Sequence, residues 1–213
     1  GIAMGFAIVM EGGLFIAAAL LIGSLGAEVV AAHQVAINVA SVAFMIPLGL
    51  AMAITVRVGQ AVGREDVSGV RHAGFVGIGL VLATQAVSAT VLALAAVQIA
   101  SVYTRDAAVV AIAAHLLLFA AVFQFSDGIQ AASNGALRGL KDTRIPALLC
   151  AFAYWGVGMT TGWWLAFPGG MGAPGLWLGL IAGLSVAAVL LLWRFVALAR
   201  GASWQRLPVD ASV

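Results

Sequence analysis

The sequence predicts an all-α integral membrane protein, a bundle of six transmembrane helices. Hydrophobic residues make up 63% of the 213 positions and charged residues only 8%, whereas soluble domains carry about 25% charged residues. Lipid must therefore be the solvent for most of the surface. Long uncharged runs match the roughly 20 apolar residues that one spanning helix requires. Strands of a membrane barrel are not expected, because they are about 10 residues long and alternate in polarity.

Charged residues and one loop-forming segment delimit the expected helices. The uncharged run 145–193 is too long for one span, and the prolines and glycines of FPGGMGAPG (167–175) divide it. We expect one transmembrane lobe over 1–200 and a short polar cytoplasmic tail over 201–213. The six helices are expected near 2–22, 33–56, 73–100, 107–135, 146–166 and 175–198.

Basic residues predict the orientation. Six spans leave only Arg105 on one side of the membrane and the other nine of the ten Lys and Arg residues on the opposite side. Cytoplasmic loops carry such an excess, so both termini are expected in the cytoplasm. The nine residues are Arg57, Arg64, Arg71, Arg138, Lys141, Arg144, Arg194, Arg200 and Arg206. An interfacial belt of tryptophans is expected from Trp163, Trp164 and Trp177 on the outer side and Trp193 and Trp204 on the inner side.

Glycines spaced by four residues predict where helices pack closely. Gly175, Gly179 and Gly183 in the last expected helix follow the small-xxx-small pattern of membrane helix interfaces. We therefore expect this face to lie against another helix.

Two carboxylates interrupt otherwise apolar helices. Glu11 lies in GFAIVMEGGLFIAAALL and Asp127 in LLLFAAVFQFSDGIQAASNGAL, each roughly 12–18 Å from the nearer helix end at about 1.5 Å rise per residue. An ionisable side chain at this depth costs at least about 2.5–3.5 kcal/mol. This cost favours a function: an ion path, a proton relay or a counter-charge for a substrate. The alternative is a protonated or internally paired structural carboxyl.

Polar side chains accompany Asp127 on one helix face. The stripe is about 80° wide at 100° per residue, and we expect it to face the bundle interior or a water-filled cavity. Interhelical hydrogen bonding alone is the other explanation. Its members are Gln124, Asp127, Asn134 and Arg138, with Gln130 beside them.

The second expected helix repeats this pattern more weakly. Gln34, Asn38 and Ser41 share one face, and packing explains them as well as ligand contact does. Pro47 removes a backbone hydrogen bond and is expected to kink the helix near 43–47.

Two buried carboxylates suit coupling to a cation. Sodium, a hard ion, prefers oxygen ligands, and a carboxyl in a low-dielectric site can hold a proton near neutral pH. If Glu11 and Asp127 bind Na⁺ or H⁺, a cationic compound would compete for the same negative charge, which produces antiport. No resident cofactor is expected. The sequence shows no metalloenzyme spacing and no nucleophile motif, and its scattered charges do not suit nucleic acid.

The segment AAHQVAINVASVAFMIPLGLAMAITVRVGQAVGRED (31–66) resembles the eighth helix and following loop of the multidrug and toxic compound extrusion (MATE) family, NorM-like branch. FQFSDGIQAASNGALRGLKDTRIP (123–146) resembles the end of its tenth helix and the next loop. YWGVG (154–158) and GAPGLWLGL (172–180) resemble helices eleven and twelve. The resemblance implies the second lobe of a twelve-helix transporter of the bacterial plasma (inner) membrane. Its partners would be an N-terminal six-helix lobe, organic cations and membrane lipid.

The resemblance also implies residue roles. Glu11 and Asp127 match acidic residues that help bind the coupling cation, so they would be the Na⁺ ligands of a sodium-coupled member. Phe44 matches an aromatic position that can add a cation–π contact. The expected substrate-binding residues are Gln34, Asp106 and Asp127, which match family contacts to cationic drugs, together with Asn38 and Gln124.

One of these positions has an alternative role, and one further position departs from the family pattern. Asp106 has an alternative role as the N-terminal charge of a helix. Thr160 stands where family members often have a proline, so the fifth helix is expected to be straighter.

The sequence thus predicts half of a cation-coupled antiporter for organic, mostly cationic compounds, and not an enzyme. A lipid-linked oligosaccharide flippase of the same superfamily is the nearest rival, but it would favour a cationic cavity. A non-transporting membrane scaffold fragment is the other alternative.

Overall fold

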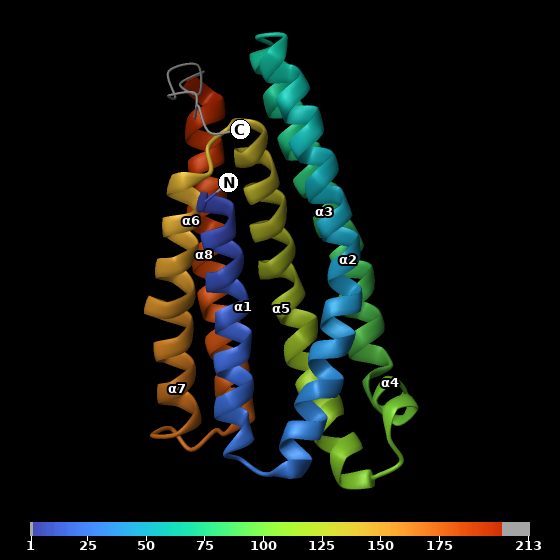
Figure 1. The fold of residues 1–213 in the computed structure, drawn as a ribbon. Helices are drawn as coiled ribbons and strands as arrows, with labels where there is room; N and C mark the ends of the chain where they lie inside the picture. The colour runs from blue at the N-terminus through green and yellow to red at the C-terminus, as the bar shows by residue number, and fades with distance from the viewer. Residues whose placement is uncertain (1, 202–213) are drawn as a thin grey trace.

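The computed structural model describes residues 2–201, and this part of the chain is helical with short turns. Six segments run up and down side by side (Figure 1). Five of them are long and apolar enough to cross a membrane, and α1 adds a shorter apolar stretch, Val9–Gly23. The elements are α1 (Ile2–Gly23), α2 (Ala27–Gly63), α3 (Val67–Leu94), α4 (Ala96–Tyr103), α5 (Ala107–Gly139), α6 (Arg144–Ala151), the π-helix η1 (Phe152–Met159), α7 (Thr160–Ala166) and α8 (Ala173–Gly201).

The ends of the segments separate the basic residues as expected. α1 begins and α8 ends at the upper end in Figure 1, where the α2–α3 and α5–α6 turns also lie. We call this the basic end of the bundle. The tail expected after 200 lies outside the described residues except for Gly201, and so do Trp204 and Arg206. The assignment of the basic end to the cytoplasm stays a prediction.

The second and third expected helices had the wrong boundaries. α2 and α3 run through most of the expected loop 57–72, and only 64–66 form the turn between them. Asp66 begins α3, because its Oδ1 accepts a hydrogen bond from the Gly69 amide at 2.8 Å. A charged residue ends an apolar run, but it does not end a helix that continues beyond the hydrocarbon into the headgroup layer.

Two further irregularities were not located from the sequence. The third segment ends at Leu94, and a separate short helix, α4, follows. In the fifth segment η1 replaces regular α-helix. The straighter helix expected around Thr160 stays a prediction. The Thr160 hydroxyl donates to the carbonyl of Gly156 at 2.5 Å and of Val157 at 3.1 Å, which satisfies backbone groups at the end of the π-helix. Pro47 is accommodated inside α2, which continues through it.

α5 is the central helix and contacts α2, α3, α4 and α8. It crosses α2 closely because Gly135 and Gly139 carry no side chain. A Cβ at either position would overlap a main-chain carbonyl of α2, that of Ala51 or of Thr55. The Thr55 hydroxyl donates to the Gly135 carbonyl at 2.9 Å, a direct bond between the two helices.

The glycine face of α8 packs as predicted. Gly179 and Gly183 lie against the backbone of Gly162 and Gly158 in the neighbouring segment, and Gly175 lies against the end of α7. The predicted tryptophan belt is wrong for Trp177, which is fully buried. Trp163, Trp164 and Trp193 are exposed, and their place at the interface stays a prediction. Trp177 packs edge-on against the rings of His33 and Phe123, with centroid separations of 5.9 Å. Its position near a helix end therefore did not place it at the interface.

An ion pair joins α8 to the α5–α6 turn. Nε of Arg194 donates to Oδ2 of Asp142 at 2.5 Å, and the Asp142 side chain is buried. We expect Asp142→Asn to lower the free energy of unfolding by about 1.5–3 kcal/mol, the worth of a hydrogen bond between charged groups. Thermal unfolding of the detergent-solubilised full-length protein measures this effect. Arg200→Gln, which alters an exposed charge on the same helix, is the matched control. Equal melting temperatures for the two variants would contradict the prediction.

Candidate functional site

A cavity of about 300 Å³ lies between α1, α2 and α5. We call it the carboxylate cavity. It brings together Glu11 from α1, Phe44 from α2 and Asp127 from α5, the three residues expected to take part in cation coupling. The remaining lining residues are mostly apolar: Phe15, Ile37, Ala40, Ser41, Met45 and Phe123.

The electrostatics of the carboxylate cavity favour a bound cation. Glu11 and Asp127 both line it, and Asp127 is only 6% exposed. Two negative charges in a mostly apolar cavity repel each other with little screening by water. A proton on one carboxyl or a cation between them removes this repulsion. The cavity fits a hard monovalent ion, because Ser41 can add an oxygen ligand and Phe44 an aromatic face.

A second, more polar hollow of about 550 Å³ lies between α2 and the region where α4 leads into α5. We call it the polar hollow. Gln34, Asn38 and Asp106, three of the expected substrate-binding residues, line it. Ile37 and Ser41 line both this hollow and the carboxylate cavity, so the two are neighbours along α2.

Two polar side chains in the polar hollow also have structural partners. The Tyr103 hydroxyl donates to Oδ1 of Asn38 at 2.7 Å, which links α4 to α2. Oδ1 of Asp106 accepts from the amides of Ala108 at 2.9 Å and Val109 at 3.3 Å. Asp106 is therefore the N-cap of α5, as its alternative role required, and its carboxylate still faces the hollow.

The structure does not bring Gln124 to either hollow. Its Oε1 accepts from the Ser88 hydroxyl at 2.8 Å, and its main-chain carbonyl accepts from Nε2 of Gln85 at 2.9 Å. Gln124 therefore faces α3, while Asp127, three residues later, faces α1 and α2. The predicted polar stripe on α5 is so wide that one edge contacts α3 and the other faces α1 and α2.

Tyr154 and Gln130 form a hydrogen-bonded pair that the sequence did not single out as part of the site. Nε2 of Gln130 donates to the Tyr154 hydroxyl at 2.7 Å, and both side chains are buried. Gln130 follows Asp127 by three residues on α5. The π-helix η1, which carries Tyr154, contacts α1, the helix of Glu11. The pair therefore lies near the two carboxylates. The tyrosine of YWGVG and the position of Gln130 beside the polar stripe were the only signals for it.

Comparison with known proteins identifies the family. Residues 3–164 match the profile of the MatE family. The chain belongs to this family. It is 57% identical to the probable multidrug resistance protein NorM of Xanthomonas campestris pv. campestris. That alignment has 195 residues and covers 92% of this chain and 43% of the relative. The multidrug resistance protein PmpM of Pseudomonas aeruginosa is 45% identical, with 94% of this chain and 43% of PmpM covered.

Solved MATE structures show the same fold. The eukaryotic MATE transporter AtDTX14 superimposes with a TM-score of 0.85 at 25% identity, over 97% of this chain and 48% of that one. A MATE structure in the bent conformation superimposes with a TM-score of 0.86 at 19% identity, over 95% of this chain and 46% of that one. The chain thus spans less than half the length of the proteins it matches and corresponds to the C-terminal half of a NorM-like MATE protein.

The Tyr154–Gln130 pair yields a prediction for this MATE lobe. Tyr154→Phe removes the hydroxyl that Gln130 contacts and leaves the ring in place. A buried hydrogen bond contributes about 1 kcal/mol, so we expect cation binding in the full-length transporter to weaken about fivefold. Titration of the transporter with the coupling ion measures this change. Tyr103→Phe, which breaks the bond to Asn38 outside the carboxylate cavity, is the control and should leave the affinity unchanged. Equal effects of both changes would refute the assignment.

Proposed function

We propose that this lobe is the cation-coupling half of an antiporter that exports organic, mostly cationic compounds in exchange for Na⁺ or H⁺. The observation that carries the proposal is the meeting of Glu11, Asp127 and Phe44, from three different helices, in one cavity. The multidrug resistance names of the NorM and PmpM relatives support the export of drugs.

The arrangement of the two hollows supports exchange rather than simple binding. A cation in the carboxylate cavity neutralises the charge that a cationic compound would otherwise use. The polar hollow is larger, shares Ile37 and Ser41 with the carboxylate cavity, and carries the Asp106 carboxylate. A compound held there would reach toward Asp127 when the coupling ion leaves. Competition for one negative region couples the two fluxes. In this proposal the first lobe completes the substrate path.

Ethidium efflux under imposed gradients tests the proposal. The full-length transporter with this lobe is placed in vesicles, and sodium and proton gradients are applied separately. We expect efflux to follow one of the two gradients and to be lost in Asp127→Asn. Glu28→Gln is the matched control, because Glu28 is an exposed carboxylate near the start of α2. No efflux under either gradient, from protein that is folded in the membrane, would refute export and favour the flippase or the scaffold.

A further inference from the structure

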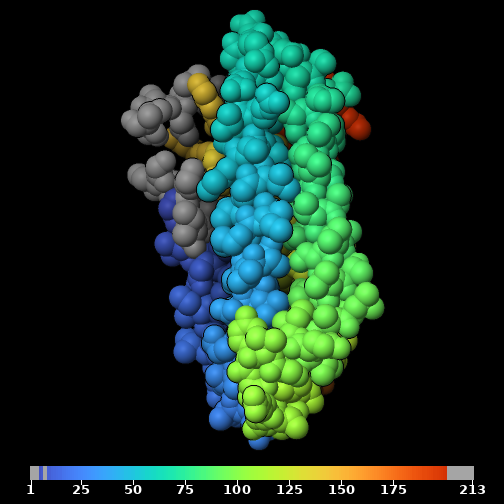
Figure 2. Space-filling view, turned by 90° about the vertical axis from the view of Figure 1, so that its right-hand side faces the viewer, coloured from blue at the N-terminus to red at the C-terminus, as the bar shows by residue number. Residues whose placement is uncertain are grey.

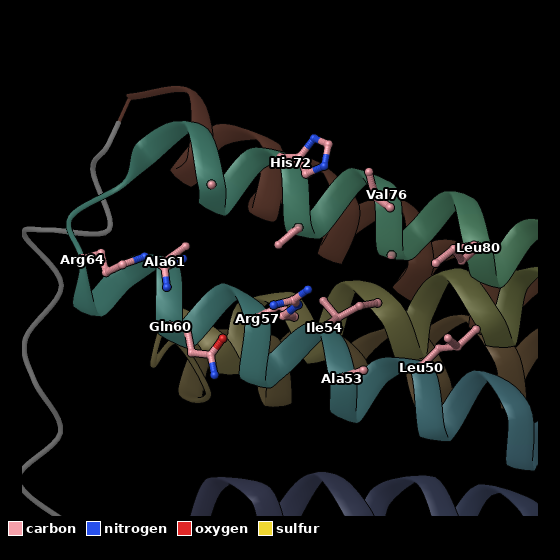
Figure 3. A pocket seen from close by; sticks show the side chains of 13 residues that line it. Leu50, Ala53, Ile54, Arg57, Gln60, Ala61, Arg64, His72, Val76 and Leu80 are labelled. Atoms are coloured by element: carbon pink, nitrogen blue, oxygen red, sulfur yellow. The ribbon is translucent and has the colours of Figure 1, made fainter.

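A third cavity, of about 390 Å³, lies between α2 and α3 near the basic end of the bundle (Figure 3). We call it the basic cleft. It lies further along α2 than the carboxylate cavity, from Leu50 onward, and shares no lining residue with it. Its polar residues are Arg57, Gln60, Arg64 and His72, and its apolar wall includes Leu50, Ile54, Val76 and Leu80.

The arginines of the basic cleft have no ion-pair partner within residues 2–201. Figure 3 shows Arg57 on the α2 wall of the cleft and Arg64 at its far end, near the turn to α3. The neighbouring carboxylate of Asp66 is engaged, since it caps α3 through the Gly69 amide. Both arginines are exposed. They are therefore available to an external anion.

More positive charge lies beside the cleft. A shallow hollow on the α3 side shares His72 and Val76 with the basic cleft and adds Arg71. Glu65 in the α2–α3 turn is exposed, and with the capping carboxylate of Asp66 it supplies the negative charge nearby. The three arginines outnumber the two carboxylates of this turn, Glu65 and Asp66, so the region keeps a net positive charge.

The order of residues along α2 matches the order of groups in a phospholipid. From Leu50 through Ile54 the wall is apolar, and Arg57 and Arg64 follow toward the end of the helix. At about 1.5 Å per residue this stretch is about 20 Å long, close to one leaflet of a hydrocarbon core about 30 Å thick plus its headgroup layer. The α2–α3 hairpin forms one side of the bundle, with both helices side by side over its height (Figure 2).

The two helices approach closely within the stretch that lines the cleft. Gly77 lets Ile54 approach the α3 backbone so closely that a Cβ at Gly77 would overlap the Ile54 side chain. Toward the turn the walls carry Arg57 and His72 instead. The result is an apolar slot that becomes basic at its outer end.

We propose that the basic cleft binds an anionic membrane phospholipid, with the phosphate on Arg57 and Arg64 and an acyl chain along Leu50, Ile54, Val76 and Leu80. Guanidinium groups bind phosphate oxygens in bidentate fashion. Basic pockets between helices at the cytoplasmic side of membrane proteins hold anionic headgroups in this way. The assignment does not depend on cation coupling or on the transported compound.

The test is lipid binding to the full-length transporter in neutral detergent after removal of native lipid. Dioctanoyl phosphatidylglycerol is titrated and compared with dioctanoyl phosphatidylcholine and inorganic phosphate, and binding is followed by thermal stabilisation and native mass spectrometry. We expect only phosphatidylglycerol to bind tightly. In Arg57→Gln/Arg64→Gln its affinity should fall about 30-fold, because each arginine near an anionic headgroup contributes about 1 kcal/mol.

Two variants separate this site from general charge effects. Arg200→Gln removes an exposed arginine at the same end of the bundle and should leave the affinity unchanged. Leu80→Asn alters an exposed part of the apolar wall and should weaken phosphatidylglycerol without affecting the arginines.

Four outcomes would overturn the proposal. Saturation by inorganic phosphate alone would indicate a site for free anions. Equal binding of phosphatidylcholine would show that the site does not recognise the negative charge of the headgroup. Unchanged affinity in the double arginine variant would place the lipid elsewhere. Absence of phosphatidylglycerol binding to the wild-type transporter would indicate that another part of the protein, such as the first lobe, covers the cleft.

Discussion

A full-length transporter carrying Asp127→Asn is expected to bind its coupling cation at least about 30-fold more weakly than the unaltered protein. Asp127 is buried and lies in the carboxylate cavity with Glu11. Removing one charged partner from a desolvated ionic contact costs about 2–5 kcal/mol, and 2 kcal/mol corresponds to the 30-fold loss. The measurement is thermal stabilisation by the ion that the efflux experiment names, with sodium titrated against choline or the pH lowered in steps.

A double-mutant cycle shows whether the two carboxylates act on one ion. Glu11→Gln alone should weaken binding by a similar factor. The combined variant should lose less than the two losses added together, since groups that share one ligand are not independent. Glu28→Gln, at an exposed position, should bind like the unaltered protein. Strict additivity, or tight binding in Asp127→Asn, would show that the cation binds outside the carboxylate cavity.

Gly179→Leu is expected to prevent the lobe from folding. A Cβ at Gly179 would overlap the backbone of Gly162 and the carbonyl of Gly158. Backbone atoms cannot turn aside as a flexible side chain can, so α8 would have to separate from α7 and η1. Overpacking of a well-packed interior costs about 1–3 kcal/mol for added methylenes, and separation of two helices also exposes the contacts around them.

The fraction of monodisperse protein after detergent extraction measures this effect, by size-exclusion chromatography. Gly79→Leu is the matched control. It places the same side chain on a membrane helix, where an added Cβ would meet nothing within 4 Å. We expect most of the Gly179→Leu protein to aggregate and most of the Gly79→Leu protein to remain monodisperse. Equal recovery of the two would show that the α7–α8 contact is not essential to the fold.

The candidate site was predictable from the sequence where residue type conflicted with its surroundings. A carboxylate in an apolar helix carries a cost that can be recognised without a structure, so Glu11 and Asp127 were singled out. The role of Phe44 came from the resemblance, and the structure places its ring in the same cavity. Gln124 could not be placed correctly from the sequence. Its spacing from Asp127 predicted that both lie on one stripe, but its contacts with α3 show that it faces away from the carboxylate cavity.

The sequence by itself determined that the chain is a six-span membrane lobe, and it indicated the approximate positions of the spans and the two carboxylates within them. These features depend on the cost of placing each residue type in lipid, which is largely independent of its neighbours in the fold. Tertiary structure alone decided which helix each face meets, how far α2 and α3 extend past the apolar core, and that Trp177 is buried. Helical periodicity defines the angle between two side chains on one helix, but not which helix packs against each of them. That neighbour depends on how closely two helix backbones can approach, and here glycines far apart in the sequence allow the close approach.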